Sequence, residues 1–180
     1  MNAKFLNSKE RKSLIEELRT IYGIEELPKM LLEVGKQKIR GFSGNMTKEE
    51  IFELNKLANV EVIGLYLLSK RDKDPRLNFD AVSLLKNQIK KSIIQITQNQ
   101  YELWMRGKDL EIQTQTGMVI LQLVSARQQK CEAFLQTDSE KSRQMRAETW
   151  KDLVGCGTSN GNKIYNFIPK ERQLKTPLPK

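Results

Sequence analysis

The chain has 180 residues, and its 31 Lys and Arg against 22 Asp and Glu give a formal net charge of +9. So large a positive excess favours a polyanionic partner, and nucleic acid is the commonest polyanion that proteins meet. The sequence has no histidine, which excludes Ser-His-Asp triads, Cys-His pairs and histidine-based zinc sites.

Cysteines and apolar runs narrow the class of protein further. The two cysteines, Cys131 and Cys156, are too few for a disulfide framework or a zinc knuckle, so we expect no metal and no cofactor. No apolar run is long enough to span a membrane, and no apolar signal segment follows Met1. We therefore expect a cytoplasmic protein with free thiols and no membrane partner.

The first expected element is an amphipathic helix near the start of the chain. Asn7 and Glu10 have the spacing of a capping box, in which each side chain bonds the other residue's backbone N–H. Leu14 and Leu18 then recur on one helical face. Gly23 stands where a helix C-terminus favours glycine, so we expect the helix to end there.

The next segments alternate between strand and helix signals. Residues 38–42 have strand character, and Thr47 begins a second capping box that opens a helix. Residues 60–68 are apolar and β-branched, which predicts a central strand. The charged segment 69–76 predicts a loop and, between residues 73 and 74, a domain boundary.

The rest of the chain predicts short strands around one short helix, which Thr97 begins and Gly107 ends. Runs of apolar and β-branched residues predict strands at 92–96, 118–121 and 163–168. The polar stretch 125–151 favours helix and is expected as an insertion between two strands. The fold class is therefore α+β, with an N-terminal α/β domain over 1–73 and a β-rich domain over 74–180.

Two segments of the second half carry a family resemblance. Residues 101–108 form a short helix signal that ends in Arg-Gly, and residues 155–172 run from Gly-x-Gly through Asn to Pro-Lys and Arg. The pattern resembles the PUA-like RNA-binding module at the C-terminus of Sun/RsmF-type rRNA cytosine-C5 methyltransferases. The residues that match are Trp104, Arg106, Gly107, Gly117, Gly155, Gly157, Asn166, Pro169, Lys170 and Arg172.

The resemblance extends to standalone archaeal ribosome biogenesis proteins of that group, over residues 5–123 and 153–175. It implies that residues 74–180 form a PUA-like β-barrel interrupted by the helical insertion. It also implies an RNA partner, either rRNA in a pre-ribosomal particle or, as the alternative, tRNA. Thr158 and Tyr165 stand where the module usually has lysine, and Lys163 lies two residues before Tyr165.

The C-terminal segment has the chemistry that RNA binding needs. Residues 151–180 contain six basic and two acidic residues, which favours salt-dependent phosphate binding. Glycine lets backbone approach a phosphate or base closely, and an exposed aromatic side chain stacks an unpaired base. The candidate RNA-binding residues are Gly155, Gly157, Asn160, Gly161, Lys163, Tyr165, Asn166, Lys170, Arg172 and Lys175.

Some of these residues also have a structural interpretation. Tyr165 and Phe167 alternate with Ile164 and Ile168 on the expected strand, so either pair is able to face the core. Trp104, together with the arginine that follows it, fits a role in organising the junction between helix and strand. Secondary candidates for RNA contact are Arg106, Lys108, Lys36, Lys38 and Arg40.

Three functions follow from these features. The first is a non-catalytic RNA-binding accessory factor in rRNA modification or ribosome biogenesis, since the usual general base is missing. The second is a protein-docking subunit that targets a separate RNA-modifying enzyme, with the insertion 125–151 as docking surface. The third is a metal-dependent enzyme acting on nucleic acid, in which Asp72, Asp74 and Asp80 hold Mg²⁺; the competing interpretation is a solvated loop.

Overall fold

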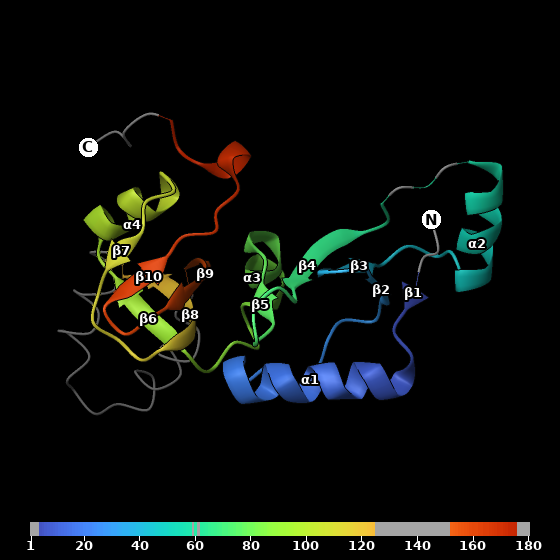
Figure 1. Cartoon of the computed structure of the whole chain (residues 1–180), viewed down its shortest axis with the longest axis horizontal. Coiled ribbons are helices and arrows are strands. Elements are labelled where there is room, and N and C mark those ends of the chain that lie inside the picture. Colours follow the sequence, from blue (N-terminus) through green and yellow to red (C-terminus); the bar gives the residue numbers. More distant parts are fainter. Residues whose placement is uncertain (1–3, 59, 61, 125–151, 176–180) are drawn as a thin grey trace, which may run out of the picture. The chain divides into compact units, whose positions relative to one another are not determined.

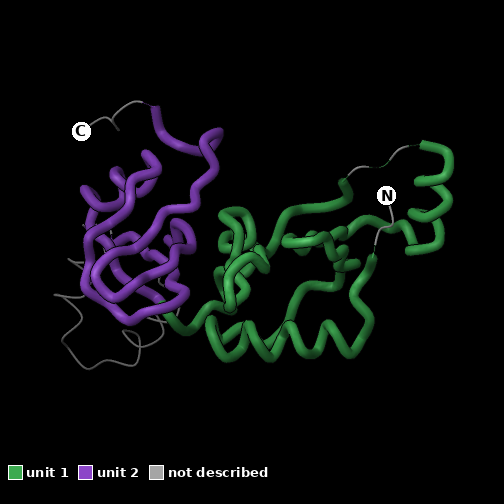
Figure 2. The backbone as a smooth tube through the Cα atoms, in the orientation of Figure 1, with its two compact units in different colours: residues 1–92 green, residues 93–180 purple. Residues whose placement is uncertain are grey.

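The chain folds into two compact units, residues 1–92 and residues 93–180, in the computed structural model (Figure 2). The structure describes residues 4–58, 60, 62–124 and 152–175. Each unit has its own five-stranded sheet and its own helices (Figure 1). Among the described residues, no helix is both long and apolar enough to cross a membrane.

Unit 1 is built on an antiparallel sheet in which the strands follow chain order, β1-β2-β3-β4-β5. Helix α1 precedes β2, α2 lies between β3 and β4, and α3 follows β5. The elements are β1 (Lys4–Phe5), α1 (Ser8–Tyr22), β2 (Leu31–Val34), β3 (Lys38–Phe42), α2 (Lys48–Leu57), β4 (Leu65–Ser69), β5 (Arg76–Leu77) and α3 (Phe79–Leu85).

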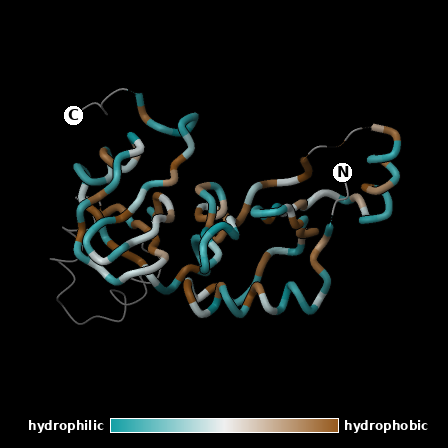
Figure 3. Tube along the Cα trace, viewed as in Figure 1, coloured by the Kyte–Doolittle hydropathy of each residue, from teal (hydrophilic) through white to brown (hydrophobic). Residues whose placement is uncertain are grey.

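The local signals at α1 are confirmed. Asn7 accepts a hydrogen bond from the Glu10 N–H, and the Glu10 carboxylate accepts one from the Asn7 N–H. Gly23 ends the helix in the left-handed conformation, with φ 74°. Hydrophilic and hydrophobic residues alternate along the helix (Figure 3). Leu14 and Leu18, on its apolar face, are buried.

The strand expected over 60–68 is shorter, because β4 begins only at Leu65. Gly64 has a positive φ of 79°, and a Cβ there would lie 2.3 Å from the Gly41 carbonyl oxygen. The chain therefore turns tightly against the β3 backbone at Gly64, which sequence composition did not reveal. Beyond this turn, β4 pairs with β3 and buries Leu67 and Leu68.

The division between the units falls after residue 92 rather than between residues 73 and 74. Tyr22 is fully buried, and its hydroxyl donates to the Pro75 carbonyl at 2.9 Å. The Tyr22 carbonyl in turn accepts from the Lys90 and Lys91 N–H groups. Strand β5 also pairs with β4. These contacts tie residues 74–92 to α1 and the first sheet.

Unit 2 is built on a mixed sheet in the order β6-β8-β9-β10-β7. Strands β6 and β8 are parallel, and α4 lies in the connection between them; the other pairs are antiparallel. The elements are β6 (Ile93–Ile96), α4 (Gln98–Met105), β7 (Leu110–Glu111), β8 (Gly117–Leu123), β9 (Leu153–Ser159), β10 (Lys163–Tyr165) and the 3₁₀ turn η1 (Lys170–Arg172). The expected insertion, 125–151, lies outside the described residues.

The core of unit 2 comes from α4, β8 and β10. Val119, Ile120 and Leu121 of β8 and Ile164 of β10 are fully buried, together with Trp104 of α4. Thr97 caps α4 in the predicted capping box with Gln100. The strand expected over residues 163–168 is shorter, because β10 ends at Tyr165 and the chain then leaves the sheet.

Candidate nucleic-acid interface

Trp104 holds together the segments that carry the sequence resemblance. Its side chain has no exposed surface, and its indole N–H donates to the Val154 carbonyl oxygen at 3.3 Å. A large buried aromatic needs both packing and a partner for its N–H, and the strand β9 supplies both. Trp104 therefore organises the helix–strand junction, as its structural interpretation predicted.

The Gly-x-Gly of β9 makes room for this tryptophan. A Cβ at Gly155 would lie 2.9 Å from the Trp104 Nε1 atom, and one at Gly157 would lie 3.0 Å from its ring and 2.6 Å from Ile164. Both glycines are buried. The structure thus places these two candidate RNA-binding residues in the interior, where they accommodate an indole rather than approach a phosphate.

Asn166 has a comparable structural role just after β10. Its side-chain amide donates to the Trp104 and Lys108 carbonyl oxygens at 2.6 and 3.0 Å, and its side-chain oxygen accepts from the Ile168 N–H at 2.7 Å. Its backbone N–H donates to the Asp109 carboxylate at 2.8 Å. The amide is used within the protein, so Asn166 fixes the end of α4 against the chain after β10.

The segment after η1 returns to the same place. The Leu174 N–H donates to the Met105 carbonyl oxygen at 2.8 Å, and the Gln173 amide donates to the Ile168 carbonyl oxygen at 3.0 Å. Gly107 has a φ of 77°, and a Cβ there would lie 2.3 Å from the Gln173 side chain. Three segments, 104–109, 163–168 and 169–175, therefore meet in one hydrogen-bonded corner.

These three segments contain six basic residues, which we call the C-terminal cationic corner: Arg106, Lys108, Lys163, Lys170, Arg172 and Lys175. Two of them have carboxylate partners. The Lys163 ammonium lies 2.9 Å from the Asp109 carboxylate, and the Arg106 guanidinium lies 3.7 Å from the Glu102 carboxylate. Lys108, Lys170 and Lys175 are exposed, and within the described part of the chain no carboxylate pairs with them. Their charges are available to a ligand.

The ion pair between Asp109 and Lys163 sets the electrostatics at the base of the corner. The hydrogen bond from the Asn166 N–H, and then that from Lys163, lower the pKa of Asp109. The Asp109 carboxylate in turn raises the pKa of Lys163. Both groups are therefore ionised at neutral pH, and much of the positive charge of Lys163 is balanced locally.

Two aromatic side chains lie beside these cations. Ile164 and Ile168 face the core, whereas Tyr165 and Phe167 are 39% and 42% exposed. The Lys163 ammonium lies 5.5 Å from the Tyr165 ring centroid. Of the two pairs that the sequence left open, the isoleucines thus face the core and the aromatic side chains face the surface. Stacking on an unpaired base requires this orientation of the aromatic rings.

The turn between β9 and β10 orders Tyr165. Asn160 accepts from the Asn162 and Lys163 N–H groups and donates to the Tyr165 hydroxyl at 3.1 Å. Gly161 has a φ of 101°, which only glycine adopts without strain. Asn160 and Gly161 thus position the aromatic side chain, and both belong to the candidate site in this supporting sense.

The remaining candidates lie in unit 1. Lys36, Lys38 and Arg40 belong to the β2–β3 hairpin. Asp72 pairs with Arg76 at 3.7 Å, and in the described ranges no group of three or more His, Cys, Asp or Glu is placed to hold a metal ion. Asp72, Asp74 and Asp80 therefore do not form the Mg²⁺ site considered from the sequence.

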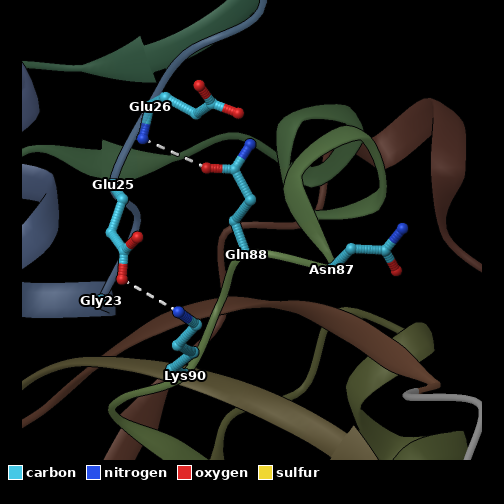
Figure 4. Close-up of a pocket in the computed structure, with 6 residues that line it drawn as sticks. All are labelled: Gly23, Glu25, Glu26, Asn87, Gln88 and Lys90. Carbon is cyan, nitrogen blue, oxygen red and sulfur yellow. Dashed lines mark hydrogen bonds and ion pairs between the residues drawn. The ribbon is translucent and has the colours of Figure 1, made fainter. Parts of the chain in front are cut away.

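Unit 1 also has a pocket of about 370 Å³, lined by Gly23, Glu25, Glu26, Asn87, Gln88 and Lys90 (Figure 4). Lys90 pairs with Glu25 at 2.9 Å, and the Glu26 N–H donates to the Gln88 side chain at 3.2 Å. Two carboxylates against one ammonium make the lining unsuited to phosphate. The pocket therefore does not belong to the candidate interface.

Sequence reasoning missed Asp109 and Gln173. Asp109 directly follows the Arg-Gly-Lys segment, and Gln173 directly follows Arg172, yet neither carries a signal of its contacts. Both act through long-range hydrogen bonds, to Asn166 and to Ile168, of which local sequence spacing gives no indication.

We predict that Gly157→Ala destabilises the protein by about 1–3 kcal/mol, because the new methyl group overfills the space beside Trp104 and Ile164. Urea unfolding followed by Trp104 fluorescence, in a Trp150→Phe background, measures the effect. Gly35→Ala is the control, since its Cβ would meet its nearest atom at 3.5 Å, and it should change stability by less than about 0.5 kcal/mol. Equal stability of the two variants would contradict the packing described here.

The lowered pKa of Asp109 predicts a pH dependence of stability. A carboxyl whose pKa is lower in the folded than in the unfolded state stabilises the fold above its unfolded pKa, and this stabilisation is lost as pH falls through the folded pKa. From about pH 5 downward, wild type should therefore lose more unfolding free energy than Asp109→Asn. Parallel acid-induced losses in urea titrations of the two proteins would exclude this role of Asp109.

The sequence matches no protein-family model and no curated protein. A solved structure is similar to the chain: the crystal structure of a PUA domain from Aeropyrum pernix K1, in complex with tartrate. The similarity covers 94% of this chain and 86% of that chain, with 15% sequence identity and a TM-score of 0.49.

Proposed function

We propose that the chain is a non-catalytic, cytoplasmic RNA-binding protein, an accessory factor in rRNA modification or ribosome biogenesis. Unit 2 is proposed to be its PUA-like β-barrel, on the resemblance of residues 101–108 and 155–172 to that module. The RNA is proposed to lie over the C-terminal cationic corner. Lys108, Lys170 and Lys175 contact phosphate, and Tyr165 and Phe167 stack on unpaired bases.

One observation carries the proposal. Segment 104–109 is distant in sequence from the consecutive segments 163–168 and 169–175, and hydrogen bonds join all three into one corner. The segments of that corner carry exposed lysines and two half-exposed aromatic rings. Cations bind phosphate by releasing counterions, and aromatic rings accept bases of any sequence. The combination favours RNA with unpaired bases over duplex.

We predict that Lys108→Gln/Lys170→Gln/Lys175→Gln weakens binding to single-stranded oligouridine and flattens its salt dependence. Each lost phosphate contact on a single strand lowers the slope of log affinity against log salt by about 0.7, so three contacts account for about 2. Fluorescence anisotropy over a salt series measures both quantities.

The matched control is Lys12→Gln/Lys29→Gln/Lys91→Gln, which removes the same charge from three exposed lysines of unit 1. It should keep the wild-type slope to within the loss of one contact. If the wild-type protein binds RNA with no salt dependence, or if both triple variants behave alike, the corner is not the RNA site.

A second candidate function is supported by an apolar surface in unit 1. Of the ten residues of α2, only Ile51 is buried. Leu57 is 87% exposed and Leu54 39%, and Val62 and Leu65 beyond the helix are 56% and 42% exposed. Exposed apolar patches of this kind mark protein contacts. A docking subunit that targets an RNA-modifying enzyme would use these side chains in addition to the insertion 125–151, the docking surface predicted from the sequence, which lies outside the described residues.

We predict that Leu54→Ser/Leu57→Ser abolishes capture of an RNA-modifying enzyme from nuclease-treated native extract. Leu84→Ser is the control, because Leu84 is 47% exposed on α3. Recovery of the enzyme by wild type and the control, but not by the double variant, supports the docking function. Equal recovery by all three proteins, or recovery of RNA and ribosomal particles alone, counts against it.

A further inference from the structure

Two turns of unit 1 meet at one end of its sheet. The Gly35 N–H donates to the Lys38 carbonyl oxygen at 2.8 Å and closes the β2–β3 hairpin. The chain after β4 reaches the same hairpin, because the Lys70 N–H donates to the Gln37 carbonyl oxygen at 2.8 Å. The Arg71 guanidinium also donates to the Gln37 side chain at 2.5 Å. Gln37 thus fixes the two turns to each other.

The joined turns carry four exposed basic residues, which we call the turn patch: Lys36, Lys38, Lys70 and Arg71. Lys38 and Ser69 are direct partners in the β3–β4 register, so Lys38 lies beside the start of the second turn. The Lys38 ammonium also lies 5.1 Å from the Tyr66 ring centroid. Cations from separate stretches of chain are therefore gathered at one sheet end.

Some cations of unit 1 form ion pairs with carboxylates, and those of the turn patch do not, within the described residues. Carboxylates pair with the cations Lys4, Arg19, Lys56, Arg76 and Lys90. Over the described residues, no carboxylate pairs with any member of the turn patch. The Glu10 carboxylate already accepts hydrogen bonds from the Asn7 N–H and from Lys4, and these two bonds lower the pKa of Glu10 more than the charge of Lys70 does.

Arg40, a sequence candidate, does not belong to this patch. It is the direct partner of Glu33 in the β2–β3 register, and Glu33 is a buried carboxylate, 2% exposed. Arg40 is itself only partly exposed. Its Nη1 atom would lie 4.0 Å from a Cβ at Gly35, and its charge is less accessible than the charges of Lys36 and Lys38, which are exposed.

We infer that the turn patch is a second RNA-binding surface, which holds the phosphate backbone of RNA. The inference rests on the proposed RNA-binding function. The turn patch has four cations without a carboxylate partner, on two turns that are hydrogen-bonded to each other. Such a group fits a polyanion, whose phosphates repeat along a strand, better than it fits a single acidic side chain. The backbone contact is independent of sequence, so the turn patch contributes affinity and register, and the choice of base is left to unit 2.

The test is the triple variant Lys36→Gln/Lys38→Gln/Lys70→Gln, in the full chain. Its salt slope for binding oligouridine should fall by about 2, at about 0.7 for each lost phosphate contact. Lys12→Gln/Lys29→Gln/Lys91→Gln is again the charge-matched control and should keep the wild-type slope. Replacing the same three residues of the turn patch by Arg should also keep it, because the positive charge remains.

The outcomes separate this inference from the proposed function. If wild type has no salt-dependent RNA binding, the proposed function fails and takes the inference with it. If wild type and the variant of the C-terminal cationic corner behave as proposed, but the turn-patch variant equals its control, only the inference is overturned. Loss of binding to phosphatidylserine vesicles with RNA binding intact would also overturn it, since the partner would then be an anionic membrane surface. Circular dichroism of each variant establishes that it is folded.

Discussion

The burial of the Trp104 indole is the constraint on which unit 2 depends. An indole with no exposed surface displaces much water, and it fits only where the opposing strand has no side chains. Gly155 and Gly157 provide that gap. The Trp104 carbonyl then accepts from Asn166, which places the chain after β10 against the end of α4. The cationic corner is a consequence of this packing.

The charges of the protein fall into two groups that net charge alone does not distinguish. Lys163 and Arg106 are paired with Asp109 and Glu102, so their charges are partly balanced. Lys108, Lys170 and Lys175 have no such partner in the described chain. Exposed ion pairs contribute little to stability, whereas unpaired cations at one site contribute directly to polyanion binding. The same contrast between paired and unpaired cations recurs in unit 1 at the turn patch.

Local features could be predicted from the sequence, and long-range ones could not. The capping boxes at Asn7, Thr47 and Thr97 were found because a cap involves residues three apart. The sequence predicts a domain boundary between residues 73 and 74, whereas the contact of Tyr22 with Pro75 joins distant parts of the chain and has no local sequence signal. The glycines of β9 were recognised as a motif, but their role depends on which side of the strand meets Trp104, and a sequence motif alone does not specify it.

Photocrosslinking of the full chain to single-stranded RNA, followed by mass spectrometry of the crosslinked peptides, tests the central claim most directly. Tyr165 and Phe167 are half-exposed aromatic residues in one segment of the C-terminal cationic corner, so bases stacked on them should crosslink there. The account predicts crosslinks in the peptides that contain these two residues. Crosslinks confined to other peptides, with RNA binding retained, would contradict it.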